Sequence, residues 1–234
     1  MESIVRVIEY EGTSEYVGQK ISKLLQDKGY SSKDLTKLRN HEDCIFLNDA
    51  AVHMNRVIEE GDVIKVALFE EKNSENVAPS DIPFHIVYED EDILVVDKPA
   101  GLPVHPSKLH PEYSLANAVA YYYRSCGHPF VFRCVNRLDK DTSGLTVIAK
   151  HMLSASVLYE AVKNRGVDRE YRAIVEDNGI VDEGIVELPI GREDETGIKR
   201  CIDSENGEYA KTNFRVISRF QVEKKKLAYV SYHL

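Results

Sequence analysis

The sequence predicts an α+β protein whose larger part contains a mixed, mainly antiparallel sheet. Many short apolar runs with strand character follow one another, and Gly, Pro, Asn and Asp mark the turns between them. Only a few segments with helical periodicity interrupt these runs, which is typical of the α+β class. The 234 residues are enough for one large domain, or for a small domain and a medium one.

Residues 1–71 are predicted to form a small α/β module. The opening run IVRVIEY alternates as a strand does, and residues 17–28 have the apolar spacing of a helix that ends at Gly29. A second helix is predicted over residues 31–39, with Ser31 or the serine after it as the N-cap. Short strands follow, with turns at Asn48-Asp49 and Gly61-Asp62.

Residues 72–83 are polar and contain proline, which predicts a linker. Residues 84–234 then form a second domain of common size. Helices are expected over residues 114–127, with Ser114 as the N-cap, and over residues 151–166. The expected strands include HIVYE, ILVVDK, FVFRCVNRL, LTVIAK and REYRAIVE, and the remaining sequence is also rich in strand patterns.

Composition excludes several protein classes. No run of about 18 apolar residues exists, and the N-terminus lacks the pattern of a secretory signal, so a cytoplasmic protein without a membrane association is expected. The cysteines form no CxxC pair and no zinc-ligand spacing, so neither a metal site nor a disulfide framework is predicted. They are Cys44, Cys126, Cys134 and Cys201.

Charge is distributed unevenly along the chain. The net charge is −9, but residues 98–172 hold 11 basic and 6 acidic side chains and four of the eight histidines. A basic region of this kind tolerates a phosphate backbone. The distribution therefore permits an RNA partner, although ordinary scatter of surface charge would produce it as well.

The segment NRLDKDTSG, residues 136–144, is the strongest candidate for chemistry. It is a polar loop between an extended apolar run and a buried strand, which is where reactive side chains are usually presented. Asp139 lies between Arg137 and Lys140, whose charges favour an ionised carboxylate. Such a carboxylate can act as a nucleophile or a general base, but an Asp in a loop can equally bond to nearby backbone amides.

This loop resembles the signature of the RluA-type RNA pseudouridine synthases, in which Arg-Leu-Asp is followed two residues later by Thr-Ser-Gly. The family often has His where this chain has Asn136. ILVVDKPAGLPVHPS, REYRAIVE and GIVELPIGRE resemble further family segments in the same order, so the resemblance covers roughly residues 80–234.

The resemblance implies an isomerase that converts specific uridines of ribosomal or transfer RNA to pseudouridine, as a monomer without metal or cofactor. Asp139 would be the catalytic carboxylate, either attacking the sugar or removing a ribose proton. Tyr171 would stack on the base, and Arg137 would fill the space left by the flipped base and contact phosphate. Further phosphate contacts are expected from Lys98, Lys140 and Arg172, for each of which the alternative is a solvated surface charge.

The N-terminal module resembles a small RNA-binding module of a small-subunit ribosomal protein, which many of these synthases also carry. The similarity lies in the helix pair, the following strand with Leu-Asn, and the GDVI sequence. Basic residues on the second helix would bind RNA, although the module is acidic as a whole and a purely structural role is the alternative. The candidates are Lys33, Lys37 and Arg39.

Two other functions stay open. The family pattern continues past Leu234 into a segment with a basic partner for the catalytic aspartate, so a C-terminally truncated chain is expected. One alternative is therefore a non-catalytic RNA-binding protein that retains the fold. The other is a hydrolase with a carboxylate nucleophile, such as a glycosidase, which needs a second carboxylate. Asp141 is the nearest candidate.

Overall fold

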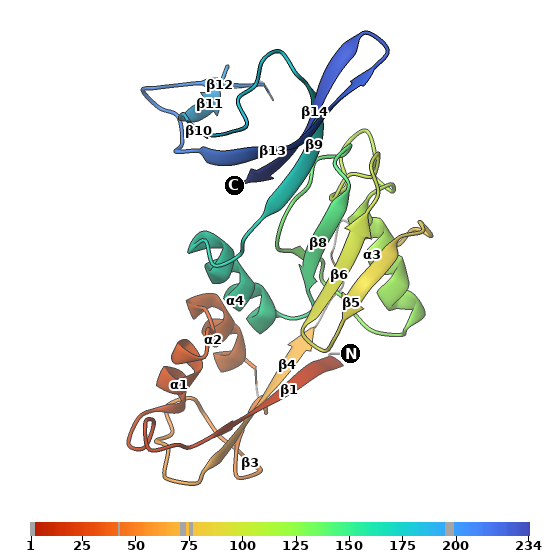
Figure 1. Ribbon diagram of the computed structural model, residues 1–234. Coiled ribbons are helices and arrows are strands. Elements are labelled where there is room, and N and C mark those ends of the chain that lie inside the picture. The colour runs from red at the N-terminus through yellow and green to blue at the C-terminus, as the bar shows by residue number, and fades with distance from the viewer. Residues whose placement is uncertain (1–2, 42, 71–73, 75–76, 195–198) are drawn as a thin grey trace. The chain divides into compact units, whose positions relative to one another are not determined.

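The computed structural model describes residues 3–41, 43–70, 74, 77–194 and 199–234. It divides into two compact units, residues 1–164 and residues 165–234 (Figure 1). Every strand pair in the described part of the chain is antiparallel, which agrees with the predicted α+β class. Of the predicted linker over residues 72–83, residues 72, 73, 75 and 76 lie outside the described residues.

The first unit begins with a four-stranded sheet in the order β1-β4-β2-β3. The Ser31 side chain accepts a hydrogen bond from the Asp34 amide, and the Asp34 carboxylate accepts one from the Ser31 amide, so the predicted N-cap is a full capping box. The turn between β2 and β3 places Asn48 and Asp49 at φ of 49° and 66°, as two-residue hairpins require. The elements are β1 (Ser3–Glu11), α1 (Ile21–Asp27), α2 (Ser32–Arg39), β2 (Ile45–Leu47), β3 (Ala50–Ala51) and β4 (Val63–Glu70).

A second four-stranded sheet follows in the same unit, in the order β5-β6-β8-β7. Its apolar core lies between the sheet and α3, and Leu94, Val96, Leu115 and Ile148 are fully buried there. The predicted extended run FVFRCVNRL contributes only the two paired residues of β7. The elements are β5 (His85–Glu89), β6 (Ile93–Lys98), α3 (Leu115–Ser125), β7 (Arg133–Cys134), β8 (Gly144–Ala149) and α4 (Met152–Lys163).

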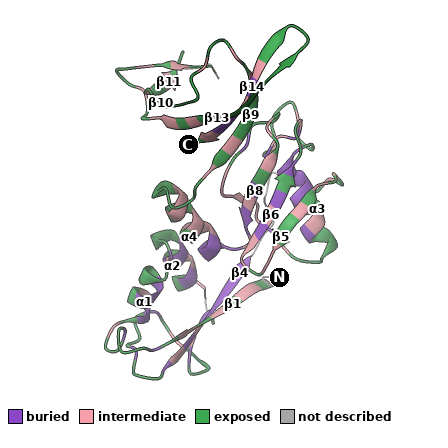
Figure 2. Ribbon diagram, in the orientation of Figure 1, coloured by how far each residue is buried: buried purple, intermediate pink, exposed green. Residues whose placement is uncertain are grey.

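Helix α4 links the second sheet to the core of the N-terminal module. It directly follows β8 of the second sheet, yet Met152 and Leu153 are buried in the core formed by α1, α2 and β4. Figure 2 shows the buried start of α4 and the mixture of intermediate and exposed residues that follows it. The hydroxyl of Ser156 on α4 also donates a hydrogen bond of 2.6 Å to the Asp34 carboxylate on α2. The N-terminal module is thus packed against the following sheet rather than held only by the chain between them.

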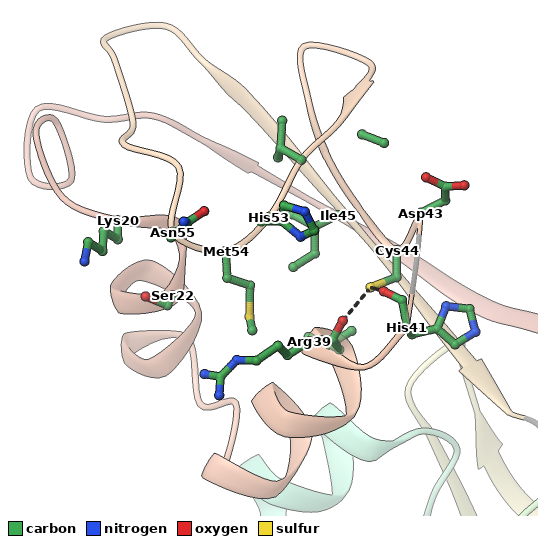
Figure 3. Close-up of a pocket in the computed structure, with 13 residues that line it drawn as sticks. Lys20, Ser22, Arg39, His41, Asp43, Cys44, Ile45, His53, Met54 and Asn55 are labelled. Carbon is green, nitrogen blue, oxygen red and sulfur yellow. Dashed lines mark hydrogen bonds between the residues drawn. The ribbon is translucent and has the colours of Figure 1, made fainter.

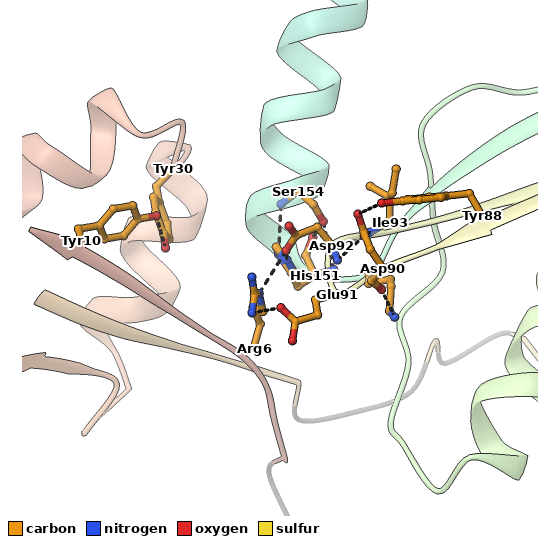
Figure 4. A network of polar contacts seen from close by, with 11 residues as sticks. Arg6, Tyr10, Tyr30, Tyr88, Asp90, Glu91, Asp92, Ile93, His151 and Ser154 are labelled. Atoms are coloured by element: carbon orange, nitrogen blue, oxygen red, sulfur yellow. Dashed lines mark hydrogen bonds and ion pairs between the residues drawn. The ribbon is translucent and has the colours of Figure 1, made fainter.

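A polar network strengthens this contact (Figure 4). Arg6 on β1 donates to the Asp92 carboxylate at 3.3 Å and forms an ion pair with Glu91. The buried His151 ring lies 2.8 Å from Asp92 through Nε2, and its Nδ1 accepts a hydrogen bond from the Ser154 amide as the N-cap of α4. Because Nδ1 accepts a hydrogen bond, the ring proton is on Nε2, which donates a hydrogen bond to the Asp92 carboxylate. The imidazole is therefore neutral in this arrangement.

The stability of this junction is expected to fall as the pH decreases below about 6.5. Burial lowers the pKa of His151, as do Arg6 and Arg133, and the bond to Asp92 opposes them. As the pH falls, His151 therefore binds a proton more readily in the unfolded chain than in the folded chain, and the free energy of unfolding decreases. His151→Asn retains an N-cap acceptor and removes the titrating group, so it should flatten the dependence of the urea midpoint on pH between about pH 5 and pH 7. An equal decline in both proteins would contradict this.

The second unit is a sheet in the order β10-β13-β14-β9, with a small two-stranded sheet of β11 and β12. The longest pairing joins β13 to β14 through a turn at Glu223, whose φ is 54°. This unit confirms the strand-rich C-terminal region that the sequence predicts. Its elements are β9 (Glu170–Glu176), β10 (Glu183–Glu187), β11 (Ile190–Arg192), β12 (Arg200–Ile202), β13 (Lys211–Val222) and β14 (Lys225–His233).

Candidate active site

Asp139 lies in the loop that connects β7 to β8, at the end of the second sheet where β6 finishes and β8 begins. Strands β6 and β8 pair so that Lys98, the last residue of β6, is opposite Gly144, the first residue of β8. Leu138 is buried and anchors the loop, whereas Asp139 is exposed. The loop therefore presents a carboxylate to solvent from a backbone that is fixed at both ends.

Lys98 is the main anchor of this end of the sheet. Its side chain is completely buried, and Nζ donates to the backbone oxygens of Pro99 at 3.0 Å, Leu102 at 2.8 Å and Lys140 at 3.0 Å. The Gly101 amide also donates to the Lys140 oxygen, at 2.8 Å. The residue directly after Asp139 is therefore held by two hydrogen bonds, one from Lys98 at the end of β6 and one from Gly101 in the loop that follows.

The structure corrects the predicted phosphate contact of Lys98. All three ammonium protons are directed to backbone oxygens, and the side chain has no exposed surface. Burial lowers the pKa of Lys98, while the charges of Asp141 and Asp139 act in the opposite direction. The sequence did contain a signal for this position, because Leu94, Val96 and Lys98 alternate on one face of β6.

Asn136 joins the loop to β8 through its side chain. Its Oδ1 accepts a hydrogen bond from the Val147 amide at 2.8 Å, and its Nδ2 donates to the Leu145 oxygen at 2.9 Å. The side-chain amide of Asn136 thus bonds to the backbone of β8 in the way a strand residue would, at a position where β7 has already ended. Further along the loop, the Thr142 amide donates a hydrogen bond of 3.1 Å to the backbone oxygen of Asp139 and closes a tight turn.

Basic groups surround the Asp139 loop. Arg137 and Lys140 are exposed on either side of Asp139. The Lys140 ammonium lies 3.5 Å from Nε2 of His110, and burial together with the charge of Arg137 lowers the pKa of His105. The structure thus places both histidines beside the cations of the candidate site.

Tyr171 and Arg172 belong to the second unit. They lie on β9, where Tyr171 is opposite Tyr232 and half-buried, and Arg172 donates to the Glu170 carboxylate at 2.9 Å. The predicted stacking of Tyr171 beside Asp139 involves two different units and stays a prediction.

A cavity of about 670 Å³ lies on the N-terminal module (Figure 3). Lys20, Arg39, His53 and Asn55 are among its lining residues. Of the three basic residues predicted on the second helix, only Arg39 lines this cavity. The other two lie along a different groove, described below.

No group of three or more His, Cys, Asp or Glu side chains in the described ranges has an arrangement that could hold a metal ion. None of the helices in the same ranges has the length and apolar character needed to cross a membrane.

Comparison with known proteins places this geometry in a family. Residues 92–233 match the family model described as RNA pseudouridylate synthase. The chain is 36% identical over 188 residues to "Uncharacterized RNA pseudouridine synthase YjbO" of Bacillus subtilis, covering 80% of this chain and 66% of that protein. It is 41% identical over 146 residues to "Ribosomal large subunit pseudouridine synthase D" of Pseudomonas aeruginosa, covering 60% and 43%.

Solved structures show the same fold. Human RNA Pseudouridylate Synthase Domain Containing 4 has a TM-score of 0.50 and 25% identity, with 64% of this chain and 58% of that chain covered. Human RNA Pseudouridylate Synthase Domain Containing 1 has a TM-score of 0.54 at 23% identity, with 66% and 60% covered. The chain spans between about two fifths and two thirds of the length of the curated relatives named here. By the extent of these matches, and in agreement with the resemblance of its Asp139 loop, the chain belongs to the RNA pseudouridylate synthase family.

Proposed function

We propose that this protein is an RNA pseudouridine synthase with Asp139 as its catalytic residue. The observation that carries the proposal is the β7–β8 loop, which combines the family sequence with a fixed backbone and an exposed carboxylate. A positioned reactive group of this kind is what catalysis at a single bond of a large substrate requires.

The reaction is an isomerisation in which atoms balance without a co-reactant. The bond between ribose C1′ and uracil N1 breaks, a bond between C1′ and uracil C5 forms, and the proton of C5 is lost while N1 regains one. Asp139 either attacks the sugar or removes a ribose proton to start the first step. Tyr171 stacks on the base and assists the loss of the C5 proton.

The proposed substrate is ribosomal RNA, with transfer RNA as the alternative. The name of the Pseudomonas aeruginosa relative refers to the large ribosomal subunit, and this supports the first choice. Arg137, Lys140 and Arg172 are exposed cations suited to phosphate contacts. The cavity with Lys20 and Arg39 gives the N-terminal module a second cationic surface for RNA. A ribosomal substrate would place the protein in the cytoplasm.

The proposal is tested with total RNA from a strain that lacks the enzyme. After incubation with the purified protein, pseudouridine is mapped by carbodiimide labelling, and the solution is analysed for free uracil. We expect new pseudouridine at defined ribosomal positions and no free uracil. Sites in transfer RNA would change the substrate, release of uracil would indicate a hydrolase, and RNA binding without either product would indicate a non-catalytic RNA-binding protein.

A further inference from the structure

A groove of about 830 Å³ lies where the N-terminal module meets the second sheet within the first unit. Helix α2 forms one side of it through Lys33 and Lys37. Arg133 of β7 and Tyr159 of α4 are among the residues of the other side. We call this feature the junction groove. It is separate from the module cavity that contains Arg39, since the two share no lining residue.

A buried carboxylate holds two cations in the junction groove. Glu70, at the end of β4, is 3% exposed. Its Oε1 accepts a hydrogen bond of 2.5 Å from Nη2 of Arg133, and its Oε2 lies 3.8 Å from Nζ of Lys37. Lys37 also donates to the Phe69 oxygen at 3.0 Å. Two cations that share one carboxylate retain a net positive charge, and both side chains are already ordered before any ligand binds.

The exposed residues of the junction groove suit a single-stranded nucleic acid. Lys33 is exposed on α2, and the Tyr159 ring on α4 is 65% exposed although it is aromatic. Proteins that bind single strands combine a positive groove for the backbone with aromatic rings on which bases stack. The groove offers both kinds of group.

The junction groove also leads to the candidate active site. Its lining includes Arg133, Cys134 and Val135, and the same chain reaches Asp139 four residues later. Four residues span at most about 14 Å, so Val135 and Asp139 are both within reach of one RNA strand. The strand that carries the target uridine would therefore extend naturally along the groove.

We propose that the junction groove binds the single-stranded RNA segment next to the target nucleoside, through phosphate contacts of Lys33, Lys37 and Arg133 and a base stacked on Tyr159. This inference rests on the proposed function, because it assigns the route of the same RNA substrate. It also gives a role to the close contact between the module and the sheet, which fixes the cations of α2 relative to β7.

The test measures RNA affinity without turnover. In the Asp139→Asn background, binding of a fluorescein-labelled mixed-sequence single-stranded RNA is followed by anisotropy over a range of salt concentrations. Lys33→Gln should reduce the slope of log Kd against log salt by about 0.7, as expected for one lost phosphate contact on a single strand. Tyr159→Ala should raise Kd about 5-fold or more through loss of base stacking.

Matched variants separate the groove from general surface effects. Tyr159→Phe retains the ring, and Lys163→Gln removes an exposed charge on the same helix outside the groove lining, so both should bind as the parent does. Unchanged affinity and salt slope in Lys33→Gln and Tyr159→Ala would overturn the proposal. Pseudouridine formation is scored separately with Asp139 intact. Its absence, together with the expected losses of affinity, would reject the proposed function and retain the groove as an RNA site.

Discussion

Replacing Asp139 with Asn is expected to lower the rate of pseudouridine formation by about 10³-fold or more, which is the range seen when a nucleophile or general base is removed. Asn has the same shape but neither attacks carbon nor accepts a proton as a carboxylate does. Because Asp139 is exposed, the free energy of unfolding should change by less than about 0.5 kcal/mol. Single-turnover kinetics with excess enzyme and urea denaturation measure the two quantities.

Asp141→Asn is the matched control for this experiment. It removes the same charge from the same exposed loop, two residues away, and should retain most of the activity. Equal losses in the two variants would show that the loop needs its negative charge as a whole. Loss only in Asp141→Asn would transfer the catalytic role to the other carboxylate.

Lys98→Met is expected to lower the free energy of unfolding of the first unit by about 3 kcal/mol. The substitution leaves the buried oxygen of Leu102 and the part-buried oxygen of Pro99 without the donor they now have, and a buried oxygen without a donor costs about 1–3 kcal/mol. The Lys140 oxygen retains the Gly101 amide but loses its second donor. We also expect activity to fall by about 10²-fold in the protein that remains folded, because the backbone next to Asp139 is less well held.

Lys108→Met tests whether the loss of stability in Lys98→Met depends on the burial of the lysine side chain. Lys108 is an exposed lysine in the loop after Leu102, so its replacement should leave the unfolding transition unchanged. If the Lys98→Met protein unfolds like the wild type but binds RNA more weakly, this result would support the phosphate contact of Lys98 that the sequence predicted.

Local rules predicted much of the fold. Ser31 and Ser114 cap their helices as expected, because a cap depends on residues within one turn. The turn at Asn48-Asp49 could also be predicted from the sequence, since Asn and Asp tolerate the left-handed backbone conformation. The helix predicted from residue 17 begins at Ile21 instead, and helix starts without a capping side chain are poorly marked in sequence.

The candidate site was predictable only in part. Asp139 was found through its motif, but the depth of Lys98 was missed because a charged residue was assumed to be at the surface. The early end of β7 follows from the Asn136 side chain, which pairs with a strand nine to eleven residues further along the chain. The bond between Arg133 and Glu70 joins residues 63 positions apart, and no local pattern reports such a contact.

The shared carboxylate of Glu70 has a consequence for engineering this family. A module taken from another synthase and grafted ahead of the second sheet would have to bring its own acid at the end of β4, or Arg133 would lose its ion-pair partner in a half-buried position. The graft would also have to accept Met152 and Leu153 into its core. Chimaeras that change RNA specificity would therefore be joined more safely by exchanging α4 together with the module than by cutting in the linker.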